Sequence, residues 1–455
     1  MKKYYLILLA ILLVLTAGCN LARDPQTLIH EPQTLTAAEN TKTDPVTTDP
    51  QATSQTTPVD NDNIPPANIS FLTDAAFSTT RTISQLSSEF KDAYARISLD
   101  LLKKTMEAGK STVISPISVL TDIGLTTNGA RGKTQTTMLE WISPGLSIDA
   151  LNDQLFSLRE RLEKGGESTF VETDGIFLTC REDFKVNAEF LALVKDTYRA
   201  QIAQVDFTDQ GIIKSLNNWM SDSTNKLIPE VLKSGDVDIN TVMLLVNAVC
   251  FDAEWEEAFP TSGKLTFHST SGDKSVKMMM STEHSFIRGD NETGFIKEYK
   301  GGQFGFAALL PREGLSITDY VNGLDGNTFL RLISEQQTNT IVKLALPEFS
   351  CETSADLRAL LETLGLEEIF SDGADFSGLG HMDDGNGVGL GKAWHRTKLE
   401  VCETGTKAGS VSVISATASA TEPPGTERLV FDRPFVFSII ELNTGLPVFI
   451  GICDL

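Results

Sequence analysis

Residues 403–420 read ETGTKAGSVSVISATASA, and the interpretation of the whole chain depends on this stretch. Apart from Glu403 and Lys407 it is uncharged. Its small and β-branched residues suit a strand, but it has few large apolar groups that would anchor a strand in a core. A long segment of this kind inside a compact domain is usually functional or disordered. The stretch is therefore either an exposed functional loop or a flexible linker.

Composition limits the class of protein. The chain has 455 residues, 41% of them hydrophobic, which is enough to bury a substantial core. The formal net charge is −23. Because the phosphates of a nucleic acid would repel such a chain, we expect no nucleic-acid partner.

The N-terminus predicts export and a lipid anchor. Met1-Lys2-Lys3 is basic, and residues 4–15 are apolar but too few to span a bilayer stably. The sequence LTAGC at 15–19 resembles a bacterial lipoprotein signal peptide, which is cleaved before a cysteine that receives lipid. An ordinary secretory signal is the alternative. We expect residues 1–18 to be removed and lipid on Cys19 to hold the secreted protein on a bacterial membrane or cell surface, with its folded domain outside the cell.

The segment that follows differs in composition from the rest. Residues 19–80 are rich in Thr, Pro, Asp and Gln, as in TKTDPVTTDP at 41–50, and show no apolar periodicity. Such a segment cannot bury enough surface to offset the entropy lost on ordering, so we predict a disordered tether. A folded domain is expected over residues 81–455.

Apolar periodicity within that domain predicts a mixed α+β fold. Helices are expected where apolar residues recur every three or four positions, and strands where apolar runs lie between turn residues. The predicted helices cover 86–102, 116–129 (with Ser115 as cap) and 355–364; the predicted strands cover 242–251, 304–310, 341–349, 428–442 and 446–453. Helices come mostly first and strands later, without regular alternation, which indicates an α+β domain.

Motifs for enzymatic chemistry are missing. The sequence contains no HExxH, GxSxG or CxxC, and its GARGKT segment at 129–134 lacks the leading glycine of a phosphate-binding loop. Five cysteines remain besides Cys19, an odd number with no short spacing, so neither a zinc site nor a disulfide framework is expected. We predict no cofactor and no metal site. A hydrolase stays as an alternative, although no nucleophile–base pair is evident.

Several segments together resemble the serpins, from about residue 84 to residue 455. The segments are VISPIS at 113–118, NGARGKT at 128–134, LNNWM at 216–220, LLVNAVCF at 244–251, DFSG at 375–378 and FDRPFVF at 431–437. The resemblance implies a serpin fold with three β-sheets, about nine helices and an exposed reactive-centre loop at about 403–427. It also implies a protease inhibitor instead of an enzyme, most simply a monomer.

The resemblance gives the opening stretch a role. In inhibitory serpins this loop is cleaved as a suicide substrate and inserts into the central sheet, trapping the acylated serine protease. Alternate residues must then be small or uncharged, because they become buried. The expected hinge comprises Glu403, Gly405, Thr406 and Ala408. A non-inhibitory serpin that acts as a binding or structural surface protein is the alternative.

Other positions match further serpin features. Ser115, Ser118, Asn247 and His395 match the shutter, a hydrogen-bonded cluster beneath the opening strands, and Trp255 matches the breach, where the loop enters. Lys407 stands where many inhibitory serpins have Glu, and the segment between the expected scissile bond and Pro434 is about four residues longer than in familiar relatives. Another position also departs from the family pattern. Glu348 stands where some relatives have a lysine that pairs with the residue matching Glu403, so two acids are expected there.

Family spacing from Glu403 places the scissile bond between Ser419 and Ala420, with Thr417–Ala418 and Ala418–Ser419 as alternatives because the loop is longer than usual. Residues 415–420 are all small and uncharged, which suits proteases with shallow primary pockets. We therefore expect elastase-like targets first and subtilisin-like targets second.

Overall fold

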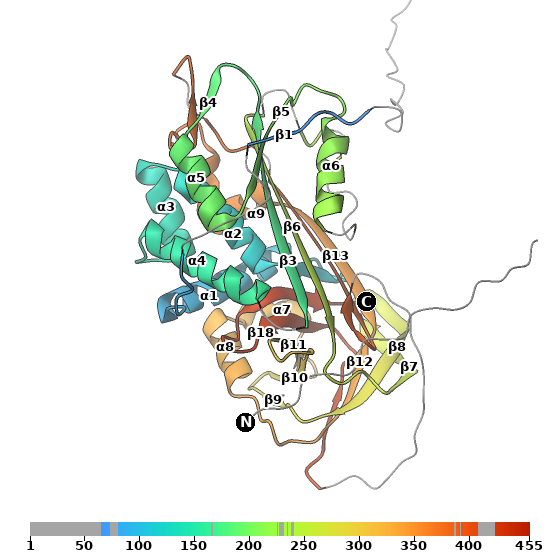
Figure 1. The fold of residues 1–455 in the computed structure, drawn as a ribbon. Helices are drawn as coiled ribbons and strands as arrows, with labels where there is room; N and C mark the ends of the chain where they lie inside the picture. The colour runs from blue at the N-terminus through green and yellow to red at the C-terminus, as the bar shows by residue number, and fades with distance from the viewer. Residues whose placement is uncertain are drawn as a thin grey trace, which may run out of the picture. The chain divides into compact units, whose positions relative to one another are not determined.

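The computed structural model describes residues 65–72, 81–164, 167–224, 226, 232–233, 235–237, 241–385, 388–391, 393–407 and 424–455. All of them belong to the unit Asp60–Leu455. Within these residues the chain forms nine α-helices, three large sheets and one two-stranded pairing (Figure 1). The predicted α+β class is confirmed. In the part of the chain that is described, no helix is both long and apolar enough to cross a bilayer.

The helices lie in two groups along the chain. They are α1 (Ser88–Thr105), α2 (Pro116–Gly129), α3 (Gly132–Ile142), α4 (Ile148–Glu163), α5 (Ala188–Tyr198), α6 (Ile212–Ser223), α7 (Ile317–Gly323), α8 (Gly326–Ser334) and α9 (Leu357–Leu361). The helix predicted at 116–129 is confirmed, and every residue of it is buried. The hydroxyl of Ser115 does not cap it, because it donates to the carbonyl of Val448 instead.

Seven strands form the central sheet. In spatial order they are β1 (Ser70–Phe71), β5 (Gln201–Val205), β3 (Thr169–Thr179), β6 (Met243–Glu254), β16 (Gly405–Lys407), β15 (Ala393–Cys402) and β13 (Phe349–Asp356). β6 pairs antiparallel with β3 and parallel with β15. The short strand β16 enters between β6 and β15 at one end only.

Two further sheets complete the domain. The second sheet has the order β2 (Thr112–Ile114), β19 (Pro447–Cys453), β18 (Phe435–Glu441), β11 (Phe304–Pro311), β10 (Glu292–Glu298) and β9 (Ile287–Arg288). The third has the order β17 (Glu427–Val430), β12 (Val342–Pro347), β8 (Gly272–Glu283) and β7 (Thr261–Ser269). The small pairing joins β4 (Phe184–Val186) and β14 (Gly380–Met382).

Side-chain alternation along the strands divides the core into two layers. Ile176 and Leu178 of β3 pack with helices α1 to α5, whereas Phe177 between them packs with Leu216 of α6. Because successive residues of a strand face opposite sides, α6 covers the face of the central sheet opposite to the other helices (Figure 1).

Three predicted elements have different boundaries. Residues 341–349 form two strands in different sheets, since Glu348 separates β12 from β13. The helix predicted at 355–364 begins only at Leu357, because β13 continues to Asp356, whose side chain caps α9. Residues 428–442 are likewise divided between β17 and β18.

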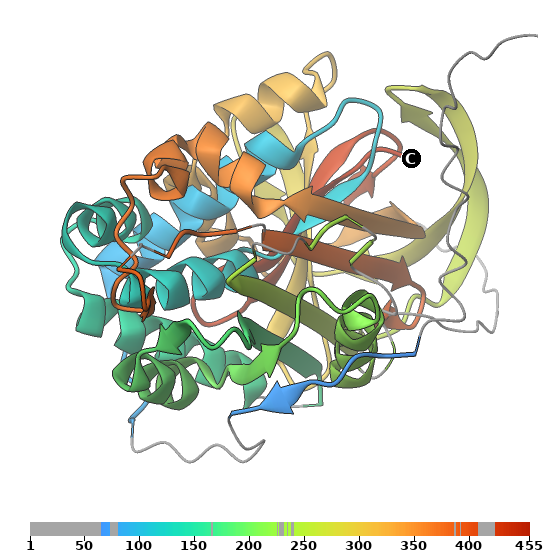
Figure 2. The ribbon, with the colours of Figure 1, turned by 90° about the horizontal axis from the view of Figure 1, so that it is seen from above.

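Part of the predicted tether is ordered. Residues 65–72 lie along the edge of the central sheet, where β1 pairs antiparallel with β5 (Figure 2). The carbonyl of Ala67 accepts the hydroxyl of Ser215 in α6 at 2.7 Å, and a Cβ on Gly211 would fall 2.1 Å from the carbonyl oxygen of Pro65. This strap, residues 65–72, therefore contacts the start of α6, and ordered structure begins before residue 81.

Candidate functional site

The predicted hinge begins inside the central sheet. After β15 the chain turns at residues 403–404 and returns as β16. Thr406 pairs antiparallel with Val401 of β15 on one side and with Ala253 of β6 on the other. The first residues of the predicted reactive-centre loop thus already lie between the two strands that loop insertion would separate.

Local packing explains the residue types at the hinge. A Cβ on Gly405 would lie 2.1 Å from the carbonyl oxygen of Ala253, so only glycine allows this approach of the two strands. Thr406 is completely buried. Its hydroxyl is 2.5 Å from the hydroxyl of Tyr299. An uncharged, small residue at 406 agrees with the inward direction expected from the sequence.

The predicted breach residue, Trp255, holds the turn that precedes the hinge. Its indole N–H donates to the carbonyl of Cys402 at 2.9 Å, and its backbone N–H donates to the carbonyl of Thr404 at 3.0 Å. The ring stacks on Tyr299 with centroids 4.4 Å apart and an interplanar angle of 13°. Trp255 is buried, but its hydrogen bonds go to the base of the loop, which a purely space-filling core aromatic would not require.

Two acids meet beside the hinge, as the sequence predicted, and a third residue holds them. The Nζ atom of Lys277 in β8 lies 2.8 Å from a carboxylate oxygen of Glu348 and 2.8 Å from one of Glu403. Lys277 was not predicted, because it belongs to β8 of the third sheet.

Farther from the hinge the central sheet is closed. Residues 393–396 of β15 pair directly and in parallel with residues 245–248 of β6. His395 is the register partner of Asn247 in this contact. The sheet is therefore parted by β16 at one end and joined by a short parallel contact at the other.

The four predicted shutter residues form one hydrogen-bonded chain at this contact. The backbone N–H of Ser115 donates to Nε2 of His395 at 3.3 Å, which makes Nε2 the acceptor and Nδ1 the protonated nitrogen. The Nδ1–H group donates to the hydroxyl oxygen of Ser118 at 3.3 Å, and that hydroxyl donates to Oδ1 of Asn247. Burial lowers the pKa of His395 to about 4, so the ring is neutral at neutral pH.

The chain continues into a buried acidic cluster that sequence reasoning missed. The side-chain amide of Asn247 donates to Asp174 at 2.6 Å and to Glu172 at 3.3 Å, both on β3. Arg159 of α4 donates to Asp174 at 2.7 Å. Burial, followed by the proximity of Asp174, raises the pKa of Glu172. Hydrogen bonds thus connect β15, α2, β6, β3 and α4.

Some predicted site residues lie outside the described residues. These are Ala408 of the hinge, Ser419 and Ala420 of the scissile bond, and Cys19. Within the described part of the chain, no group of three or more His, Cys, Asp or Glu side chains is placed to hold a metal ion. No disulfide joins the cysteines that are described.

Comparison with known proteins agrees with this geometry. The family model described as "Serpin (serine protease inhibitor)" matches residues 92–454. Neuroserpin of Homo sapiens is 29% identical over 385 residues, covering 79% of this chain and 90% of the relative. Leukocyte elastase inhibitor of Sus scrofa is 30% identical over 385 residues, covering 79% and 97%.

Solved structures give the same result. The native state of tengpin, a thermophilic serpin, superposes with a TM-score of 0.78 at 32% identity, covering 85% of this chain and 99% of that one. The chain therefore belongs to the serpin family, whose members are generally protease inhibitors and not catalysts.

Proposed function

We propose that this protein inhibits serine proteases by inserting its cleaved loop between β6 and β15. The observation that carries the proposal is the position of β16, which already pairs antiparallel with both strands. Extension of β16 would convert one parallel contact into two antiparallel ones, which are slightly more stable per residue. Each added backbone hydrogen bond contributes about 1 kcal/mol net, and a full strand adds many.

Opening the sheet would break little direct strand pairing. Direct pairing between β6 and β15 is limited to residues 245–248 and 393–396. The residues that would enter are uncharged at every position predicted to face inward, and only Ile414 among them is large. These positions are Thr406, Ala408, Ser410, Ser412, Ile414 and Ala416. Insertion would therefore bury no charge.

The target is an elastase-like serine protease, with subtilisin-like enzymes as the second class. Small residues on both sides of Ser419–Ala420 fit a shallow primary pocket and leave a deep one unfilled. A relative named leukocyte elastase inhibitor supports this choice. Lipid on Cys19 would keep the inhibitor at a bacterial membrane or cell surface, where it meets extracellular proteases.

Incubation of the purified domain with elastase, and in parallel with trypsin, tests the proposal. We expect a complex with elastase that survives SDS and a released peptide that begins within residues 417–421, as mass spectrometry would show. Strong trapping of trypsin with no effect on elastase would contradict the target. Cleavage of the loop with no lasting complex from any of these proteases would favour the non-inhibitory alternative.

A further inference from the structure

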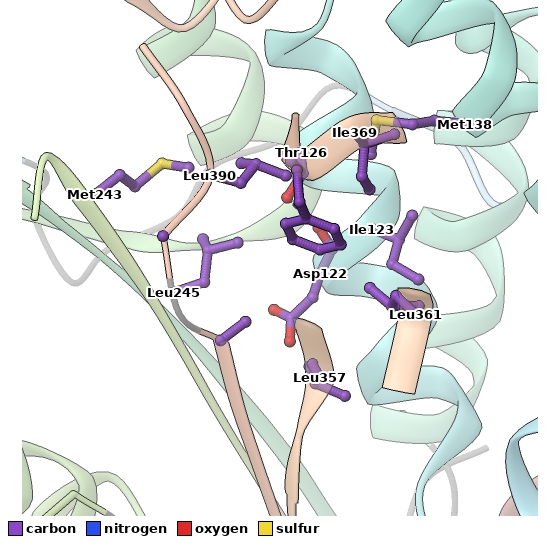
Figure 3. Close-up of a pocket in the computed structure, with 13 residues that line it drawn as sticks. Asp122, Ile123, Thr126, Met138, Met243, Leu245, Leu357, Leu361, Ile369 and Leu390 are labelled. Atoms are coloured by element: carbon purple, nitrogen blue, oxygen red, sulfur yellow. Dashed lines mark hydrogen bonds between the residues drawn. The ribbon is translucent and has the colours of Figure 1, made fainter. Parts of the chain in front are cut away.

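A cavity lies beneath the parallel contact of β6 and β15. Its volume is about 40 Å³, and its walls come from α2, α3, α9, β6 and the segment that leads into β15 (Figure 3). Most of the lining is apolar, including Ile123, Met138, Met243, Leu245 and Leu361. Empty cavities in proteins are lined by apolar groups, whereas this cavity also contains a carboxylate.

Asp122 of α2 supplies that carboxylate. The residue is 5% exposed, and its side chain points into the cavity (Figure 3). Among the described residues its carboxylate forms no hydrogen bond and no ion pair. A buried polar group without a partner costs free energy, and a buried charge costs more. Burial, then the proximity of Asp174 and Glu172, raises the pKa of Asp122 well above its usual range.

We propose that the cavity binds a small aliphatic ammonium ion, with its ammonium group on Asp122 and its alkyl chain against the apolar wall. The charge of the site selects a cation. Three buried acids, Asp122, Glu172 and Asp174, lie near one guanidinium, that of Arg159, which already pairs with Asp174. An alkylammonium ion would give the carboxylate the charged hydrogen-bond donor that it lacks.

The size of the cavity limits the alkyl chain. Since a water molecule needs roughly 10–15 Å³ of such space, 40 Å³ holds about three or four heavy atoms. A propylammonium ion matches this size.

The location of the cavity indicates how a bound ion would affect the contact between β6 and β15. Leu245 and Ala393 are register partners in the contact between β6 and β15, and both line the cavity. A ligand that touches both strands would favour the closed sheet over the opened one. This consequence for loop insertion rests on the proposed inhibitory function, whereas binding itself does not.

Methionine methyl groups provide a direct test of binding. Met138 and Met243 lie on opposite sides of the cavity, whereas Met279 of β8 is not among its lining residues (Figure 3). We would label the methionine methyls of the whole chain with ¹³C and titrate n-propylammonium chloride, 1-propanol and sodium chloride. We expect n-propylammonium to shift Met138 and Met243 but not Met279, with an affinity about ten- to hundredfold above that of 1-propanol.

Two variants separate charge from shape. Asp122→Asn should remove the preference for the cation while leaving weak binding of 1-propanol, and Asp372→Asn, at an exposed acid, should behave like the wild type. Equal binding of propanol and propylammonium by the wild type, or no shift at Met138 and Met243, would overturn the proposal even if Asp122→Asn failed to fold. Slower loop insertion with bound propylammonium is measured separately, so its absence would affect only the coupling.

Discussion

Glu348 and Glu403 share one cation, because Nζ of Lys277 lies 2.8 Å from a carboxylate oxygen of each. Glu403 is the first residue after β15, and Glu348 stands between β12 and β13, so the contact joins the third sheet to the base of the loop. The two carboxylates raise the pKa of Lys277 against the opposing effect of its desolvation. Lys277 therefore compensates the repulsion between two acids at the base of the loop.

Replacing Lys277 should loosen the hinge. In Lys277→Met the two carboxylates repel each other without compensation, and we expect the melting temperature of the intact protein to fall by roughly 2–4 °C at low salt, with partial recovery at high salt. Scanning calorimetry at two ionic strengths measures this. Lys274→Met, at an exposed position of the same strand, is the matched control and should change little.

Thr406→Arg should convert the inhibitor into a substrate. Residue 406 is already completely buried between β6 and β15 in the intact protein, so an arginine there would hold the start of the loop out of the sheet, and insertion past it would bury the guanidinium at a cost of several kcal/mol. The variant should still be cut in the loop but form no SDS-stable complex, as gel electrophoresis would show. Thr406→Val keeps the size without a charge and should still trap protease; trapping by both variants would disprove the inward orientation of residue 406 during insertion.

Loop cleavage should stabilise the protein. If the cleaved segment inserts as a full strand, about ten new backbone hydrogen bonds would raise the melting temperature by roughly 20 °C or more. Melting curves before and after limited cleavage of the loop measure the difference. Identical melting temperatures would mean that insertion does not occur and that the chain is not an inhibitor of the trapping type.

His395 should make the native state sensitive to mild acid. Its pKa is about 4 when buried and its ordinary value is 6.5, so between these values the unfolded chain binds more protons. Stability is therefore lost as the pH falls from about 6.5 towards 4. Relative to His395→Gln, the wild type should lose on the order of 2 kcal/mol of unfolding free energy between pH 7 and pH 5. Urea unfolding at both pH values tests this, with His284→Gln, at an exposed site, expected to follow the wild type.

Sequence patterns correctly predicted the elements that have strong apolar periodicity and a residue that marks the boundary of the element. The helix at 116–129 follows Ser-Pro, which favours a helix start, and was predicted correctly. The apolar run at 341–349 was read as one strand, because composition does not reveal that the chain changes sheets at Glu348. The strap at 65–72 was missed because it depends on pairing with the edge strand β5, which local composition cannot report.

The site was predictable only in part. His395, Ser118 and Asn247 came from the family resemblance and do form one hydrogen-bonded chain. Glu172 and Asp174 were missed, since acids in an alternating strand ordinarily face solvent. Arg159 pairs with them from α4, the helix that precedes β3, and a contact between a helix and a strand leaves no periodic signal in the sequence.

The strap at 65–72 also determines where mechanical force would enter the domain. Tension applied through the N-terminal segment reaches residues 65–72 before the other described residues. There the N–H of Ala67 donates to the carbonyl of Gly211, just before α6, and the two-residue strand β1 pairs with β5. Because this pairing is so short, its hydrogen bonds would break under tension before those of the long strands of the sheet. When the protein is pulled by its N-terminus, residues 65–72 would therefore detach from β5 while β6, β15 and the hinge residues Gly405 and Thr406 keep their pairing.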